Sequence, residues 1–186
     1  EDARRMTEAF FKKDKQVPLY YDAERVDRYE RTLGHVYNTK GNSLAGELLR
    51  AGLGFHVAIP PNLSLSECLH DQQQIARTKG LGIWSNAYWR AKPAAQLSED
   101  DTGFMRVTGR VISVRHAQSI WLELDGPIAI KITPSDLPNF SVRSWKGWEG
   151  RQVEVRGWVT ESGSEKRKPS KKSKAQTQSK PLVVQP

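Results

Sequence analysis

The pattern of apolar residues changes once along this chain, close to residue 93. Before that point, apolar side chains recur every three or four residues in several segments, which is the spacing of one helix face. After residue 103 they fall into short runs that alternate with polar residues, as in strands. The residues between, Lys-Pro-Ala-Ala followed by an acidic run, predict a linker over 93–103. The chain is therefore expected to form two domains.

The first domain, 1–92, is predicted to mix helices with short strands. A capping-box pattern begins at Ser64, where the Ser64 hydroxyl and the Glu67 carboxylate can pair with helix amides, and Gly80 fits the end of that helix. Cys68 falls on the inner face of this helix and is expected to be buried. The expected helices are 1–13, 43–51 and 65–79, and the expected strands are 17–21 and 32–38.

The second domain, 104–160, is predicted to consist of short strands. The Asp125-Gly126 pair is a hairpin signal between two of them. Strands of this length, interrupted by one irregular segment, are typical of a small barrel of the oligonucleotide/oligosaccharide-binding (OB) type. The expected strands are 104–114, 119–124, 128–132 and 153–159, with a possible final strand over 181–184.

The net charge of +8 is concentrated near the C-terminus. Residues 161–180 hold seven cations against Glu161 and Glu165, a local excess of 7 − 2 = +5. Because the segment is poor in apolar residues, 161–186 is predicted to be disordered apart from the possible final strand. No stretch approaches the roughly 18 consecutive apolar residues of a membrane span, so no membrane partner is expected.

One charged motif, Asp27-Arg28-Tyr29-Glu30-Arg31, precedes a predicted strand. Together with Leu48–Gly54 and Gly80–Ser85, it resembles the staphylococcal-nuclease-like (thermonuclease) family. The resemblance implies an α+β fold over 1–92, the second half of an OB-fold barrel with its helices. The full fold expectation is this partial barrel followed by a second, small OB-like barrel.

The same resemblance assigns roles within the motif. Arg31 matches the arginine that donates to the scissile phosphate and is the catalytic candidate, while Arg28 and Tyr29 match residues that contact a neighbouring phosphate. A planar guanidinium that stays charged suits a phosphodiester whose oxygens gain negative charge under attack. Without the resemblance, the motif is equally consistent with a solvent-exposed loop that has no binding role.

The family implies Ca²⁺, but its carboxylate ligands and general base lie on strands before the first helix. Glu1, Asp2 and Glu8 fall on the predicted helix itself, so no metal ligand is assigned. The family's base-pocket tyrosines also lack counterparts in the stretch 55–60. The chain is therefore expected to be catalytically incomplete.

The chain enters the family pattern midway, which favours a truncated or processed product. An exported or periplasmic location is suspected for the parent protein, while the localisation of this chain stays open. An incomplete barrel also leaves an unpaired strand edge, which predicts possible self-association.

A second group of candidates combines aromatic and basic residues, as single-strand-binding grooves do. Trp121, Trp145, Trp148 and Trp158 could each stack on a base, but for Trp121 and Trp158, which alternate with polar residues in strands, burial in the core is at least as good an interpretation. The nucleic-acid-binding candidates outside the motif are Arg143, Trp145, Lys146, Trp148, Lys166, Arg167, Lys168, Lys171 and Lys172.

The leading functional hypothesis is a portion of a Ca²⁺-dependent phosphodiesterase that acts on single-stranded or double-stranded DNA or RNA. The alternative is a non-catalytic nucleic-acid-binding or scaffold protein with a degenerate nuclease-like domain. A third possibility is a protein-interaction module with a solubilising basic terminus.

Deleting residues 162–180 is expected to flatten the salt dependence of nucleic-acid binding. Each single-strand phosphate contact contributes about 0.7 to the slope of log affinity against log salt, so losing four contacts changes that slope by about 3. Sequence preference should stay unchanged, because phosphate contacts read no bases. Binding of a fluorescent oligonucleotide across a salt series measures both, and identical slopes would show that the segment does not take part.

Overall fold

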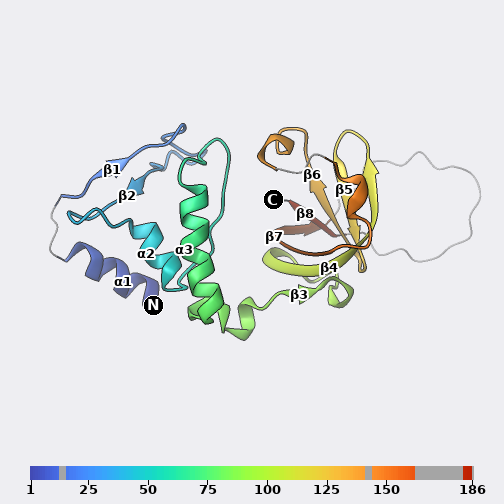
Figure 1. Ribbon diagram of the computed structural model, residues 1–186, viewed down its shortest axis with the longest axis horizontal. Coiled ribbons are helices and arrows are strands. Elements are labelled where there is room, and N and C mark those ends of the chain that lie inside the picture. The colour runs from blue at the N-terminus through green and yellow to red at the C-terminus, as the bar shows by residue number, and fades with distance from the viewer. Residues whose placement is uncertain (13–15, 141–143, 162–181, 186) are drawn as a thin grey trace, which may run out of the picture. The chain divides into compact units, whose positions relative to one another are not determined.

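The computed structural model describes residues 1–12, 16–140, 144–161 and 182–185. The chain divides into two compact units, residues 1–89 and 90–186 (Figure 1). Within the described ranges the fold is mixed α+β, with three α-helices and two sheets. The α+β expectation is confirmed at this level.

The first unit holds all three of these helices and a two-stranded ribbon. Its three helices and both of its strands fall within the predicted ranges, and each strand is only two residues long. The Ser43 side chain accepts a hydrogen bond from the Gly46 amide and begins the second helix, as its sequence predicts. In chain order the elements are α1 (Asp2–Phe11), β1 (Leu19–Tyr20), β2 (His35–Val36), α2 (Leu44–Arg50), α3 (Ser66–Lys79) and the 3₁₀ turns η1 (Gly82–Trp84) and η2 (Ala87–Trp89).

The start of α3 differs from the prediction. Leu65 occupies the N-cap position and no side chain caps the helix, so the predicted capping box is absent. The Ser64 hydroxyl instead donates to the Asp22 carboxylate at 2.7 Å, and the Ser64 amide donates to the same oxygen at 3.0 Å. Asp22 thus accepts the Ser64 amide that the capping box assigns to Glu67, so the tertiary contact replaces the local one. Cys68 is exposed, and the prediction that it is buried is wrong.

Two glycines join the end of α2 to the segment after α3. Gly52 has φ +71° and its carbonyl accepts a hydrogen bond from the Ile83 amide at 2.9 Å. A β-carbon built on Gly52 would lie 2.3 Å from the Leu81 carbonyl oxygen, and one on Gly82 would lie 2.2 Å from the Gly52 oxygen. Only glycine lets these two backbones approach so closely.

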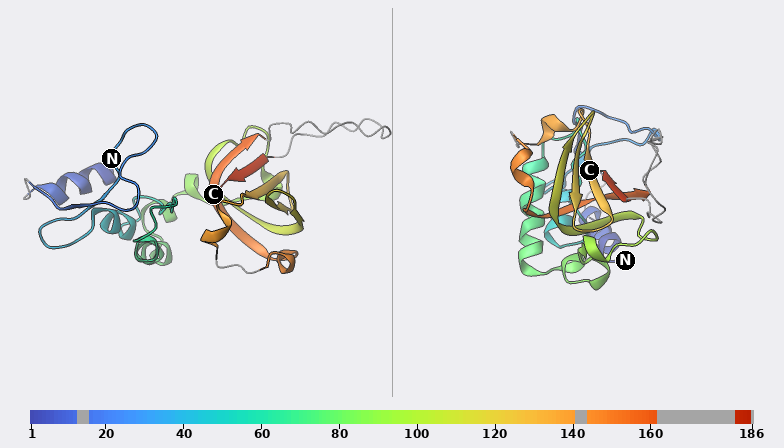
Figure 2. Two further views of the ribbon diagram at one scale, coloured as in Figure 1. Left: turned by 90° about the horizontal axis from the view of Figure 1, so that it is seen from above. Right: turned by 90° about the vertical axis from the view of Figure 1, so that its right-hand side faces the viewer.

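The second unit is a six-stranded sheet whose strands curl around a shared interior (Figure 2). The hydrogen-bonded order is β3-β4-β5-β6-β8-β7, and β4 also pairs with β7. The four strands predicted within 104–160 are all found, and β8 falls near the predicted final strand. In chain order the elements are β3 (Lys92–Pro93), the 3₁₀ turn η3 (Ala94–Gln96), β4 (Gly103–His116), β5 (Ile120–Leu124), β6 (Ile128–Ile132), η4 (Leu137–Asn139), η5 (Lys146–Trp148), β7 (Gln152–Glu161) and β8 (Leu182–Gln185).

The stretch interpreted as a linker contributes to the core of this unit. Ala94 and Leu97 are buried among the strand residues, and β3 pairs in parallel with β4. The acidic end of the stretch folds back because both carboxylate oxygens of Asp101 accept hydrogen bonds from the Lys92 ammonium at 2.7 Å. The unit therefore begins before the residues that were expected to connect the domains.

A graded series of alanine substitutions tests the glycine contact. Gly52→Ala should destabilise the first unit by roughly 2–5 kcal/mol, because a positive φ and a backbone clash act together. Gly80→Ala should cost about 1 kcal/mol, since φ is +61° but no atom lies within 4 Å of the added carbon. Helical circular dichroism during urea unfolding reports on this unit, because the described α-helices all lie in it.

Gly54→Ala is the matched control, because nothing lies within 4 Å of its added carbon and its φ is not positive. It should change the unfolding free energy by no more than about 0.5 kcal/mol. Equal effects of Gly52→Ala and Gly54→Ala would contradict the close approach.

Candidate functional site

The predicted phosphate motif forms a tight turn between two extended segments. Val26 and Thr32 form an antiparallel bridge, and inside it the Asp27 amide donates to the Arg31 carbonyl at 3.0 Å. The Glu30 amide closes a four-residue turn by donating to the Asp27 carbonyl at 3.0 Å. Glu30 has φ +61°, a left-handed conformation that a side chain disfavours by roughly 1–2 kcal/mol.

The Asp27 carboxylate organises this turn. Its Oδ1 accepts hydrogen bonds from the amides of Tyr29 at 2.8 Å and Arg31 at 3.0 Å. Its Oδ2 accepts from Arg31 Nε at 2.7 Å and lies 2.6 Å from Arg31 Nη2. The Asp27 side chain is 17% exposed whereas that of Arg31 is 72% exposed, so a sheltered anion holds an accessible cation.

The three predicted phosphate-binding residues are together on this turn. The guanidinium carbon of Arg28 lies 4.8 Å from the centre of the Tyr29 ring, and that of Arg31 lies 5.2 Å from it. Both contacts are within the range of cation–π attraction. The Tyr29 side chain is itself exposed. The turn thus presents two guanidinium groups beside one aromatic ring to solvent.

The hydrogen bond from the Arg31 side chain holds the pKa of Asp27 below its ordinary value, helped by the amides of Arg31 and Tyr29. The pKa of Asp22 is also lowered, chiefly by the Ser64 hydroxyl and then by the Ser64 amide. Both carboxylates are therefore charged at neutral pH and already hold donors.

The aromatic candidates of the second unit are arranged differently from the expectation. Trp145 is only 5% exposed and belongs to the core cluster, so a nucleobase cannot stack on it while the core stays closed. Trp148 packs against Trp145 with ring centres 4.9 Å apart, and Arg151 lies 5.6 Å from the centre of its ring. Lys146 is exposed. Burial of Trp145 followed from packing against Phe140 and Trp148, which residue spacing could not distinguish from a surface role.

The remaining candidates lie outside the described residues. They are Arg143 and the basic group Lys166, Arg167, Lys168, Lys171 and Lys172.

A calcium ion does not fit the carboxylates of the described ranges. No three His, Cys, Asp or Glu side chains converge there in a way that could hold a metal. The acid nearest to Arg31 in the turn is Asp27, and its two oxygens are occupied by Arg31 and Tyr29 donors. No catalytic step through a metal is derived for these residues.

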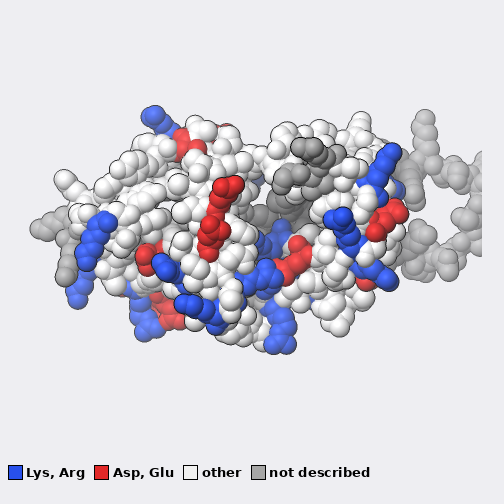
Figure 3. Space-filling view, in the orientation of Figure 1, with Lys and Arg blue, Asp and Glu red and all other residues white. Residues whose placement is uncertain are grey.

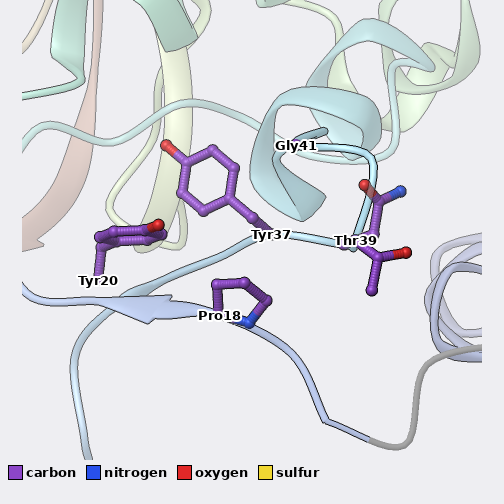
Figure 4. A pocket seen from close by; sticks show the side chains of 6 residues that line it. Pro18, Tyr20, Tyr37, Thr39 and Gly41 are labelled. Atoms are coloured by element: carbon purple, nitrogen blue, oxygen red, sulfur yellow. The ribbon is translucent and has the colours of Figure 1, made fainter.

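A pocket that the sequence did not reveal lies in the first unit, beside the β1–β2 ribbon. Its volume is about 430 Å³ and its lining holds no charged side chain. The rings of Tyr20 and Tyr37 meet edge to face with centres 5.3 Å apart and form one wall (Figure 4). Pro18 lies at the foot of that wall, while Thr39 and Gly41 bound the other side.

Basic and acidic side chains are interspersed over the face shown in Figure 3 rather than gathered into a single patch. Across the described part of the chain, no helix is long and apolar enough to cross a membrane.

One known family matches the first unit. Residues 1–86 match the family model of staphylococcal nuclease homologues. The first unit therefore belongs to this family, as the motif at Asp27–Arg31 predicts, and a nuclease-type function holds at the level of the family. No curated protein matches the chain.

The Asp27–Arg31 pair can be tested by titration. The folded pKa of Asp27 lies below the usual 3.8, so the contact stabilises the turn above that pH and is lost as the pH falls through the folded pKa. In Arg31→Gln the carboxyl titration of Asp27, followed by NMR, should move up toward the usual value. Asp22, whose pKa depends chiefly on Ser64, is the internal control and should not move. An unchanged Asp27 midpoint would contradict the assigned contact.

Proposed function

We propose that this chain carries the phosphate-binding portion of a thermonuclease-like phosphodiesterase that acts on DNA or RNA. Arg31 is the residue proposed to contact the scissile phosphate, and Arg28 and Tyr29 contact a neighbouring phosphate. The observation that carries the proposal is the exposed Arg28–Tyr29–Arg31 arrangement on a turn fixed by Asp27, in a unit of the nuclease family.

The chemistry follows from the guanidinium groups. A phosphodiester under attack gains negative charge on its oxygens, and a preorganised cation stabilises that charge more than it stabilises the substrate. Asp27 keeps the turn ordered without a ligand, so little ordering entropy is lost when a phosphate binds. The exposed side of Arg31 can then present donors in the planar fork that matches phosphate oxygens.

Among the described residues, we assign roles in phosphate binding and in stabilising the charge of the phosphate oxygens. We assign no metal ligand and no general base among them. Ca²⁺ is the cofactor that the family implies, and the described carboxylates do not fit it. The chain as given is therefore proposed to be catalytically incomplete.

The second unit is proposed to be an OB-type barrel that shares the nucleic-acid partner. Its five longer strands are paired in the order β4-β5-β6-β8-β7, and β7 returns to β4. Sheets of this kind bind oligonucleotides in many proteins, which supports the assignment by analogy of fold. The same proposal divides the chain into a nuclease-like domain, a barrel domain and a basic segment. It also includes self-association through the edge of the incomplete barrel.

Binding and cleavage by the chain test the proposal together. Arg31→Gln should weaken binding of a fluorescent single-stranded oligonucleotide by roughly tenfold, because a charge-assisted hydrogen bond contributes about 1.5 kcal/mol. Arg31→Lys should recover only part of this loss, since lysine keeps the charge but not the planar fork. Calcium should not stimulate cleavage of the same oligonucleotide above its level with a chelator.

Arg50→Gln is the matched control, because Arg50 is an exposed arginine of the same unit in the last turn of α2. It should leave the affinity within about twofold. Equal losses for Arg31→Gln and Arg50→Gln would reject the phosphate site. Chelator-sensitive cleavage would overturn the catalytic incompleteness and leave the phosphate site standing.

A further inference from the structure

One outward face of the second unit is formed by the paired strands β4 and β7, with β3 beside β4 and β8 beside β7. The two strands pair antiparallel over eight positions, and the register sets Phe104 opposite Trp158 and Arg106 opposite Arg156. Their alternate residues Val107 and Val159 are buried in the core. Because side chains alternate across a strand, the opposite set points away from the core. The set is Phe104, Arg106, Thr108 and Arg110 on β4 with Gln152, Glu154, Arg156 and Trp158 on β7.

An aromatic pair lies at one end of this β4–β7 face. The rings of Phe104 and Trp158 meet edge to face with centres 5.1 Å apart, which fixes the orientation of the indole. Trp158 is nevertheless 46% exposed. An oriented, half-exposed indole is a platform on which a planar group can stack at little cost in side-chain entropy.

Positively charged side chains lie next to the aromatic pair along β4 and β7. Three arginines and one glutamate occupy the eight positions, a net charge of 3 − 1 = +2. Glu154 accepts hydrogen bonds from Arg106 Nε at 3.1 Å and Nη2 at 2.9 Å, and the Arg106 side chain is only 10% exposed. Arg106 and Arg156 are opposite each other in the register, and Glu154 offsets the charge of Arg106.

We propose that the β4–β7 face binds single-stranded nucleic acid, with a base stacked on Trp158 and phosphates near Arg156 and Arg110. The inference rests on the nucleic-acid partner of the proposed function and assigns it a second surface. The aromatic pair and the arginine pair are two residues apart, about 7 Å along the strands, so neighbouring parts of one nucleotide chain can reach both.

A single strand fits this face better than a duplex does. The bases of a duplex are stacked on one another and cannot lie on an indole, whereas an unpaired base can. Three arginines near an aromatic ring also complement a phosphate backbone without reading sequence. An acidic protein surface would use the charges but gain little from the oriented indole.

The test is binding of a fluorescent oligothymidylate to the full chain across a salt series. Trp158→Leu should weaken binding by about fivefold or more, the lower end for loss of one base stack. Trp158→Phe should restore most of that affinity, because it keeps an aromatic face. Arg156→Gln should lower the slope of log affinity against log salt by about 0.7. The dispersion of amide signals in the NMR spectrum of each variant checks that the second unit is folded.

Two matched controls lie on the neighbouring β4–β5 surface. Trp121→Leu removes another partly buried indole, and Arg115→Gln removes a 57% exposed arginine of β4. Both should leave affinity and salt slope unchanged. If Trp121→Leu weakens binding and Trp158→Leu does not, the β4–β7 face is the wrong surface.

Two further arms separate this inference from the proposed function. Arg31→Gln combined with Trp158→Leu should lose affinity at both sites, while a duplex of the same length should be insensitive to Trp158→Leu. If Arg31→Gln lowers the affinity and Trp158→Leu does not, the inference is rejected and the phosphate site is kept. Loss with Trp158→Leu alone would keep the inference and reject the phosphate site, and equal sensitivity of duplex and single strand would reject base stacking on Trp158.

Discussion

The proposed phosphate site depends on one sheltered carboxylate, that of Asp27. Asp27 accepts hydrogen bonds from two backbone amides and from the side chain of Arg31, all within five residues of chain. Without this acceptor, Arg31 would lose the carboxylate that offsets its charge. Because these hydrogen bonds all form within the motif, the turn is ordered by its own residues. The same hydrogen bonds hold Glu30 in its left-handed conformation.

The wider first unit fixes that turn through loop contacts rather than through a long sheet. Asp22 receives the amide and hydroxyl of Ser64, and Asn62 exchanges two hydrogen bonds with the backbone of Glu24. These contacts tie the chain before the turn to the segment that leads into α3. The ribbon itself has only two residues in each strand, and its apolar residues Leu19 and Tyr20 are exposed.

In the second unit, one long strand serves two purposes. β4 spans fourteen residues and pairs with β3, β5 and β7. Its inward residues, such as Val107 and Val111, contribute to the core, while its outward residues carry arginines and an aromatic ring. Because successive side chains of β4 point to opposite faces, the residues that pack in the core differ from those proposed to bind. Substitutions at outward positions can therefore change binding with little effect on packing.

Local signals in the sequence predicted most of the elements. Ser43 begins α2 and Gly80 ends α3 because capping and left-handed backbone are properties of a few neighbouring residues. The motif at Asp27–Arg31 indicated the family of the first unit for the same reason. Three predictions differ from the structure because contacts with residues distant in the sequence decided the outcome. Ser64 is hydrogen-bonded to Asp22 and does not cap α3. Trp145, and Leu97 from the predicted linker, are both buried in the core of the second unit.

The sequence by itself determined the helices, the strands of the second unit and the charged motif of the first, since each depends on short-range periodicity or on the chemistry of adjacent residues. Only the tertiary structure decided which tryptophan is buried, which acid holds Arg31, and that Phe104 and Trp158 share a face with three arginines. The physical reason is the register between strands. The sequence of one strand shows which of its residues share a face, but packing between segments some fifty residues apart decides which residue of the partner strand lies opposite each of them.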